Sequence, residues 1–178
     1  ISTMTSMMGL WAVNYLTSVY DMSKIAASGY VVFFTFGFIA GSPVMSLSDR
    51  LLKGNYKKSL LFFTGAYFLL WFYFLIIKAG KPPVNQIPVI FFLMGIAVMV
   101  HILAFTASKD ANKIENAGVA TSVVNTMEFI GSGIINFLIA LNLQRGVPTE
   151  KAFLIILVFS AGAFIASLFV RFDNQANS

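Results

Sequence analysis

The run from Ile87 to Ala107, IPVIFFLMGIAVMVHILAFTA, contains no Asp, Glu, Lys or Arg. A helix needs about 20 predominantly apolar residues to cross about 30 Å of hydrocarbon. The run is long enough for that, and it lacks the alternation of period two that is typical of a transmembrane strand. It therefore predicts a membrane-spanning α-helix.

Five further apolar runs flank this one, two after it and three before it. The expected spans are residues 3–20, 29–47, 59–77, 87–107, 117–143 and 152–170. Short polar links separate the runs, and all 12 Lys and Arg lie in the links or the C-terminal tail. Lipid favours this distribution, because a charge at the centre of a span costs about 2.5–3.5 kcal/mol on insertion scales. We expect an all-α integral membrane protein, a bundle of six transmembrane helices.

The composition excludes several other classes of protein. Hydrophobic residues make up 58% of the chain and charged residues 11%, whereas soluble domains have about 25% charged residues. The net charge of +5 is spread over the links, so it does not indicate a nucleic-acid partner. There is no cysteine, only one His, and no phosphate-binding Gly-rich loop. We therefore expect no enzyme, no cofactor and no metal.

Charge in the links predicts the orientation. The link from Ser48 to Lys58 is the most basic, and short basic links stay on the cytoplasmic side. We place this link, the link at 108–116 and the C-terminus on the cytoplasmic side of a bacterial inner (plasma) membrane. Because residue 1 is Ile and an apolar run begins at once, we expect a piece of a longer protein.

The six spans differ in polarity. The third is aromatic all round, including Trp71, and the sixth has no strongly polar side chain, so we expect both to face lipid. Polar atoms concentrate in the first, second, fourth and fifth spans. These four are the predicted lining of a water-filled path or of helix contacts.

Glu128 is the one formal charge inside an expected span. Polar and small residues recur around it at helical spacings of three and four, which places them on one stripe of the fifth span. The stripe comprises Gly118, Thr121, Asn125, Glu128, Ser132 and Asn136. A polar stripe in lipid must face protein or water. Glu128 is the predicted proton-coupling or substrate-binding carboxyl; the alternative is a protonated Glu that bonds a neighbouring helix.

Weaker candidates lie in the other polar spans. His101 has an ordinary pKa of about 6.5, which suits proton exchange, although a lone His is as often a bonding partner between helices. The predicted transport pathway and substrate contacts are Asn14, Tyr15, Thr35, Thr121 and Asn125. Gly37 and Gly41 form a small-x-x-x-small pair that permits close helix packing.

The link after the second span carries a motif. The stretch GSPVMSLSDRLLKGNYKK runs from Gly41 to Lys58, and we expect Asp49 near a helix N-terminus, where unpaired N–H groups favour a carboxylate. The motif resembles the signature loop of the major facilitator superfamily, roughly Gly-x-Leu-Ala/Ser-Asp-Arg-x-Gly-Arg/Lys-Arg/Lys. Met45 stands where that pattern has Gly, and the segment from Arg50 is a few residues longer. The residues that the resemblance assigns to this cytoplasmic gate are Gly41, Asp49, Arg50, Gly54, Lys57 and Lys58.

Two other stretches support the resemblance. AGVATSVVN at 117–125, with the later Gly131-Ser-Gly133, is similar to the eleventh span of organic-anion and nutrient-uptake branches, and GLWAVNYL at 9–16 to the start of the seventh. The resemblance implies spans seven to twelve, two inverted three-helix repeats that form the C-terminal half of such a fold. The implied partners are the N-terminal six-helix half, the bilayer, a small-molecule substrate and protons.

The expected function is therefore membrane transport by alternating access. The resemblance suggests proton-coupled uptake of a small polar nutrient, such as an amino acid, a carboxylate or a sugar acid. An antiporter or drug-efflux protein is the alternative among transporters. A self-contained six-span channel or membrane assembly subunit is the alternative outside them.

Overall fold

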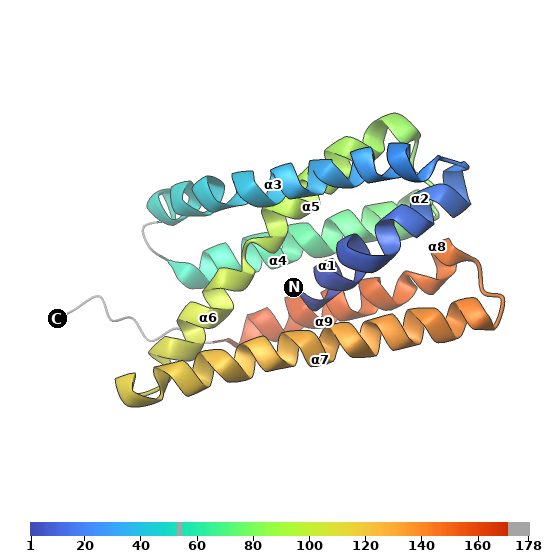
Figure 1. The fold of residues 1–178 in the computed structure, drawn as a ribbon. Coiled ribbons are helices and arrows are strands. Elements are labelled where there is room, and N and C mark those ends of the chain that lie inside the picture. The colour runs from blue at the N-terminus through green and yellow to red at the C-terminus, as the bar shows by residue number, and fades with distance from the viewer. Residues whose placement is uncertain (53–54, 171–178) are drawn as a thin grey trace.

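The computed structural model describes residues 1–52 and 55–170, except for the side chain of Asp49. Every regular element in these residues is helical. In chain order they are α1 (Ser2–Ser6), η1 (Met7–Trp11), α2 (Ala12–Tyr20), α3 (Lys24–Leu51), α4 (Tyr56–Phe72), η2 (Tyr73–Ile77), η3 (Val84–Gln86), α5 (Ile87–Val98), α6 (His101–Asp110), η4 (Ile114–Asn116), α7 (Ala117–Gln144), α8 (Thr149–Ala152) and α9 (Leu154–Phe169). The all-α prediction is confirmed for this part of the chain (Figure 1).

Five helical segments of the described chain are long and apolar enough to cross a membrane, which identifies a helical membrane bundle. They are Lys24–Ser48, Tyr56–Ile77, Val84–Asp110, Ile114–Gln144 and Thr149–Phe169. The first predicted span, residues 3–20, is also helical but is not one of these five. It carries more hydroxyl side chains than the others and is broken by the π-helical turn η1.

The first and fourth spans are interrupted near their middles. In the first, η1 separates α1 from α2. In the fourth, the helix stops at Val98 and restarts at His101, with Met99 and Val100 in a turn. In contrast, α3 and α7 run unbroken for 28 residues each, although α3 contains Pro43.

Packing joins the spans in a few strong pairs. The largest contact is between α3 and α5, followed by α4 with α9, α1 with α7, and α6 with α7; α2 also packs on α3. The first span thus lies between α3 and α7. Figure 1 shows α5 passing behind α3 and continuing diagonally into α6, which ends beside α7.

Glycines allow the closest of these approaches. A Cβ added to Gly37 would collide with the backbone of Phe92, and one added to Gly95 with the backbone carbonyl of Phe34. Gly41, one turn beyond Gly37, lies against Met99. The predicted close packing at Gly37 and Gly41 is confirmed, and we call these three positions, Gly37, Gly41 and Gly95, the glycine contact.

The third span supplies much of the core. Trp71 and Phe74 are fully buried, and Phe63 and Tyr67 are nearly so, while Phe62 is 64% exposed. The prediction that this span mostly faces lipid is wrong for this face. These aromatic side chains fill the space between the other helices, as large rings do in cores.

The link from Lys78 to Gln86 is fastened to the end of the first span. The Tyr15 hydroxyl donates to the carbonyl of Gly80 at 2.5 Å, and the Tyr20 hydroxyl donates to that of Pro82 at 2.6 Å. The two hydroxyls are themselves 3.3 Å apart. These bonds satisfy loop carbonyls that have no helical partner.

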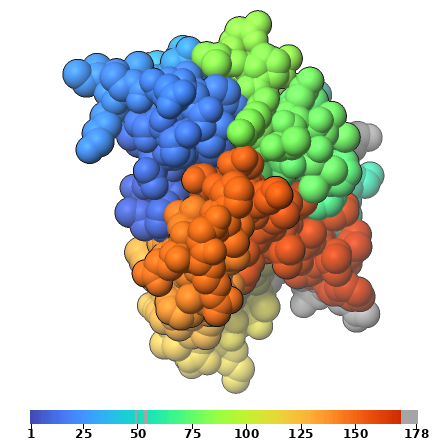
Figure 2. Space-filling model, turned by 90° about the vertical axis from the view of Figure 1, so that its right-hand side faces the viewer, coloured from blue at the N-terminus to red at the C-terminus, as the bar shows by residue number. Residues whose placement is uncertain are grey.

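Two further contacts hold the same end of the bundle. The Tyr73 hydroxyl donates to the side-chain carbonyl of Gln86 at 2.9 Å, and Lys81 pairs with Glu150 at 3.3 Å. Figure 2 looks onto this end, where the starts of α3 and α5 and the link into α8 meet. The links at this end are therefore tied to one another.

Candidate functional site

The polar stripe of α7 meets the first span over its second half. The Ser6 hydroxyl lies 3.2 Å from both the hydroxyl and the carbonyl oxygen of Ser132, and both residues are buried. The Ser2 hydroxyl donates to the backbone carbonyl of Glu128 at 2.8 Å. We call Ser2, Ser6 and Ser132 the serine contact. It provides hydrogen bonds between helices where the glycine contact provides only close approach.

The stripe continues to Asn136, whose side-chain carbonyl accepts a hydrogen bond from the Trp11 indole N–H at 3.0 Å. Trp11 is the last residue of the π-helical turn η1. The widened turn and the indole bond occur together, and π-turns inside helices are frequent at functional positions. This half of the predicted stripe faces protein.

The first half of the stripe has a different environment. Asn125 is exposed, and Thr121 and Glu128 are half-buried. The Thr121 hydroxyl donates back to the carbonyls of Ala117 and Gly118 in its own helix. Across the described residues, the carboxyl of Glu128 has no hydrogen bond or ion pair. Polar groups at membrane depth need partners, so this half requires a partner outside these six spans or water.

His101 lies at the restart of the fourth span. Its Nδ1 is 3.0 Å from the carbonyl of Val98, which leaves Nε2 as the ring nitrogen free to act elsewhere. Its ring stacks on Phe38 of α3 with centroids 6.0 Å apart. In the described residues no hydrogen bond or ion pair joins His101 to Glu128, the other predicted proton-coupling residue.

A cavity of about 640 Å³ opens beside His101. It lies among α1, α4, α6 and α9, and its lining mixes apolar side chains with hydroxyls. The polar lining residues are Ser2, Thr3, Thr64, Tyr67, His101, Ser108, Ser160 and Ser167. Several hydroxyls are already paired, Thr3 with Tyr67 at 3.0 Å and Thr64 with Ser167 at 3.1 Å. A cavity with few polar groups in an apolar wall suits a small solute or ordered water.

The other predicted pathway residues do not gather around this cavity. Asn14 on α2 and Thr35 on α3 are exposed. Tyr15 is fully buried, and its hydroxyl holds the Lys78–Gln86 link. Three of these residues are therefore exposed at membrane depth, namely Asn14, Thr35 and Asn125. Tyr15, in contrast, has a structural partner inside the bundle.

The motif from Gly41 to Lys58 takes an unexpected form. The helix α3 continues past the predicted end at Leu47, so Asp49 and Arg50 lie in its last turn. Asn55 takes the N-cap of α4, its side chain accepting from the Lys58 N–H at 3.0 Å. The backbone thus places Asn55, not Asp49, at the N-terminus of that helix.

The basic residues of the motif lie in different environments. The Lys57 ammonium donates to the carbonyls of Ser167, Leu168 and Val170 at 2.5–2.7 Å, which caps the C-terminus of α9. Arg50 and Lys58 are exposed, and Gly41 belongs to the glycine contact. Gly54 and the side chain of Asp49 lie outside the described residues.

Sequence reasoning missed the first span's share of this site. Ser2 and Ser6 are four residues apart, the spacing that puts two small polar side chains on one helix face. This spacing, compared with that of the polar stripe of α7, could have indicated a contact between the first span and α7. No signal pointed to the bond between Trp11 and Asn136.

Among the described residues, no three His, Cys, Asp or Glu side chains come together to hold a metal ion. No protein family, curated protein or solved structure matches this chain.

Proposed function

We propose that this chain is the six-helix C-terminal half of a secondary transporter, a proton-coupled uptake protein for a small polar nutrient. The observation that carries the proposal is the exposed polar part of α7. Asn125, Ser122 and Thr126 are exposed and Glu128 is half-buried, inside a helix apolar enough to cross a membrane. A second six-helix half facing this surface, with water between the halves, would satisfy these groups.

The pairing of the spans supports the proposal. In two three-helix repeats, the first, second and third spans correspond to the fourth, fifth and sixth. The contact between the first and fifth spans then corresponds to the contact between the fourth and second spans. The contact of the third and sixth spans corresponds to itself. All three pairs are among the strongest in the bundle. Because each repeat holds an odd number of spans, the two repeats would run in opposite directions through the membrane, as inverted repeats do.

The two interrupted spans fit the same scheme. The first and fourth spans correspond to each other, and each departs from regular α-helical geometry near its middle, at the π-helical turn η1 and at the turn Met99–Val100. Irregular turns of this kind inside helices are frequent at functional sites. Under this proposal the fourth span carries His101 and the fifth carries Glu128, the two groups that would exchange protons.

The experiment compares Glu128→Gln with Glu115→Gln in the full-length protein. Glu115 lies in the short helix η4 and is exposed, so its substitution controls for loss of one acidic charge. Proton entry is recorded with a pH-sensitive dye in proteoliposomes while amino acids, carboxylates and sugar acids are added in turn. We expect Glu128→Gln to abolish solute-driven proton entry and Glu115→Gln to preserve it.

Thermal unfolding of both variants in detergent establishes that they are folded. Proton entry at the normal rate in folded Glu128→Gln protein contradicts the coupling role. Proton movement out of the vesicles on solute entry identifies an antiporter and contradicts symport.

A further inference from the structure

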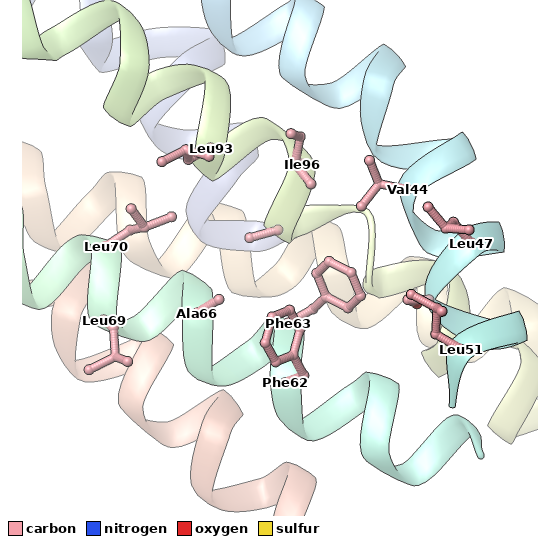
Figure 3. Close-up of a pocket in the computed structure, with 12 residues that line it drawn as sticks. Val44, Leu47, Leu51, Phe62, Phe63, Ala66, Leu69, Leu70, Leu93 and Ile96 are labelled. Carbon is pink, nitrogen blue, oxygen red and sulfur yellow. The ribbon is translucent and has the colours of Figure 1, made fainter. Parts of the chain in front are cut away.

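A groove of about 510 Å³ lies on the outer surface of the bundle, between the ends of α3 and α4 (Figure 3). Its lining is apolar apart from Ser48, whose hydroxyl bonds the Met45 carbonyl in its own helix. The lining residues are Val44, Leu47, Ser48, Leu51, Phe62, Phe63, Ala66, Leu69, Leu70, Leu93, Ile96 and Ala97. Among the side chains that the structure describes, no acidic or basic one lines it.

The groove exists because α3 and α4 both pack on α5 but barely on each other. The two helices form its walls and α5 forms its floor, as Figure 3 shows for Leu47, Phe62 and Ile96. From Phe62 to Leu70 the wall extends for about 12 Å along α4, at about 1.5 Å per residue. Its wall residues are largely exposed, Leu47 at 55% and Phe62 at 64%. An elongated apolar occupant fits this shape.

Two exposed cations, Arg50 in the last turn of α3 and Lys58 in the first turn of α4, lie next to the groove walls. Arg50 follows the wall residue Leu47 by three positions, and Lys58 precedes the wall residue Phe62 by four. Arg50 also directly precedes the wall residue Leu51, so both cations lie beside the end of the groove where α3 ends and α4 begins. Both residues are exposed, and in the described part of the chain neither has an ion-pair partner. Lys57 is different, because its ammonium is taken up by the C-terminus of α9.

We propose that this groove binds an anionic phospholipid of the bilayer, with an acyl chain along the apolar walls and the phosphate between Arg50 and Lys58. Basic pockets between membrane helices bind anionic headgroups in this way. The charges select this occupant over a second copy or a lone apolar helix, because neither would satisfy the two cations. The inference does not depend on transport; it requires only that the chain lies in a bilayer.

The test uses Phe62→Trp as a reporter inside the groove. The variant is reconstituted into vesicles that contain acyl-brominated phosphatidylglycerol or acyl-brominated phosphatidylcholine, and tryptophan fluorescence is recorded. The parent protein supplies the background from Trp11 and Trp71. Each surface cation favours an anionic lipid by about fivefold, so we expect an apparent preference for phosphatidylglycerol of roughly 25-fold at this position.

Two matched controls accompany the reporter. Phe137→Trp lies on α7 at 66% exposure, away from the groove, and should show no preference between the two lipids. Lys109→Gln removes an exposed cation from the last turn of α6 and should leave the preference at Phe62→Trp unchanged. Arg50→Gln with Lys58→Gln should abolish it.

Three outcomes overturn the proposal. Equal quenching by the two brominated lipids removes the headgroup selectivity. A preference that survives Arg50→Gln with Lys58→Gln places the phosphate elsewhere. Absence of quenching by either lipid, in protein with the helical circular dichroism of the parent, shows that the groove is covered by protein.

Discussion

The glycine contact and the serine contact join two pairs of spans by different means. At Gly37 and Gly95 the backbones of α3 and α5 approach so closely that no Cβ can be added. At Ser6 and Ser132 the first span and α7 are held by hydroxyls about 3.2 Å apart. The glycine contact depends on the absence of side chains. The serine contact depends on hydrogen bonds, whose hydroxyl groups can exchange one partner for another. We infer that the α3–α5 pair is rigid and that the contact of the first span with α7 is adjustable.

The largest expected effect is at Gly95. Gly95→Ala places a methyl group against the carbonyl of Phe34 and the amide nitrogen of Phe38, which are backbone atoms that cannot turn aside. We expect the free energy of unfolding in detergent to fall by about 1–3 kcal/mol, the usual cost of overpacking.

Gly162→Ala is the matched control, because Gly162 on α9 has open space around its Cβ position. Ala is the better helix former by up to about 1 kcal/mol, so this control should be neutral or stabilising. A Gly95→Ala protein as stable as the Gly162→Ala protein would contradict the rigidity of the glycine contact.

A smaller effect is expected at the serine contact. We propose a double-mutant cycle of Ser6→Ala and Ser132→Ala, with the free energy of unfolding measured for both single variants and the double variant. Interhelical hydrogen bonds in membranes couple by about 0.6 kcal/mol on average and by about 1.7 at most. A coupling near zero would show that the bond between the two hydroxyls does not stabilise the bundle, and the loss in Ser6→Ala alone would then report the bond to the Ser132 carbonyl.

The smallest effect is expected at Gly131, which tests whether the serine contact tolerates what the glycine contact does not. A Cβ at Gly131 would meet the Ser2 hydroxyl at 2.6 Å and the Ser2 Cβ at 3.1 Å. The hydroxyl can turn away and lose its bond to the Glu128 carbonyl, at about 0.6 kcal/mol. Greater helix propensity returns up to about 1 kcal/mol.

We therefore expect Gly131→Ala to change the free energy of unfolding by no more than about 0.5 kcal/mol. Adding Ser2→Ala to the Gly131→Ala protein should change the free energy of unfolding little further. A loss comparable to that of Gly95→Ala would show that both contacts are rigid.

The existence of the helices could be predicted because lipid leaves few alternatives for long apolar runs. Their ends could not. The helix α3 continues through Asp49 and Arg50 to Leu51, because charged residues can extend a helix beyond the hydrocarbon. The first charged residue after an apolar run marks only where the hydrocarbon ends. The turn at Met99–Val100 was equally hidden, because apolar residues fill both sides of it.

The candidate site was predictable in part. Spacing alone placed Thr121, Asn125, Glu128, Ser132 and Asn136 on one stripe, because helical geometry is local. Which part of the stripe meets another helix depends on contacts between residues more than 120 positions apart, and no local pattern contains that information. The same is true of Lys57, whose partners are carbonyls at the end of α9.

Pro43 gives the end of α3 a mechanical property of its own. Proline has no N–H, so the carbonyl of Ile39 loses its usual intrahelical partner and the helix is weakest there. The glycine contact fixes α3 up to Gly41, and the segment from Pro43 to Leu51 extends for about 12 Å beyond it, with Met45 buried in a cluster that includes Leu60 and Phe63 of α4. Bending by about 15° at Pro43 would displace its tip by roughly 3 Å, by the same rise per residue. Leu47 and Leu51 lie on this segment, so bending at Pro43 would change the width of the groove opposite α4.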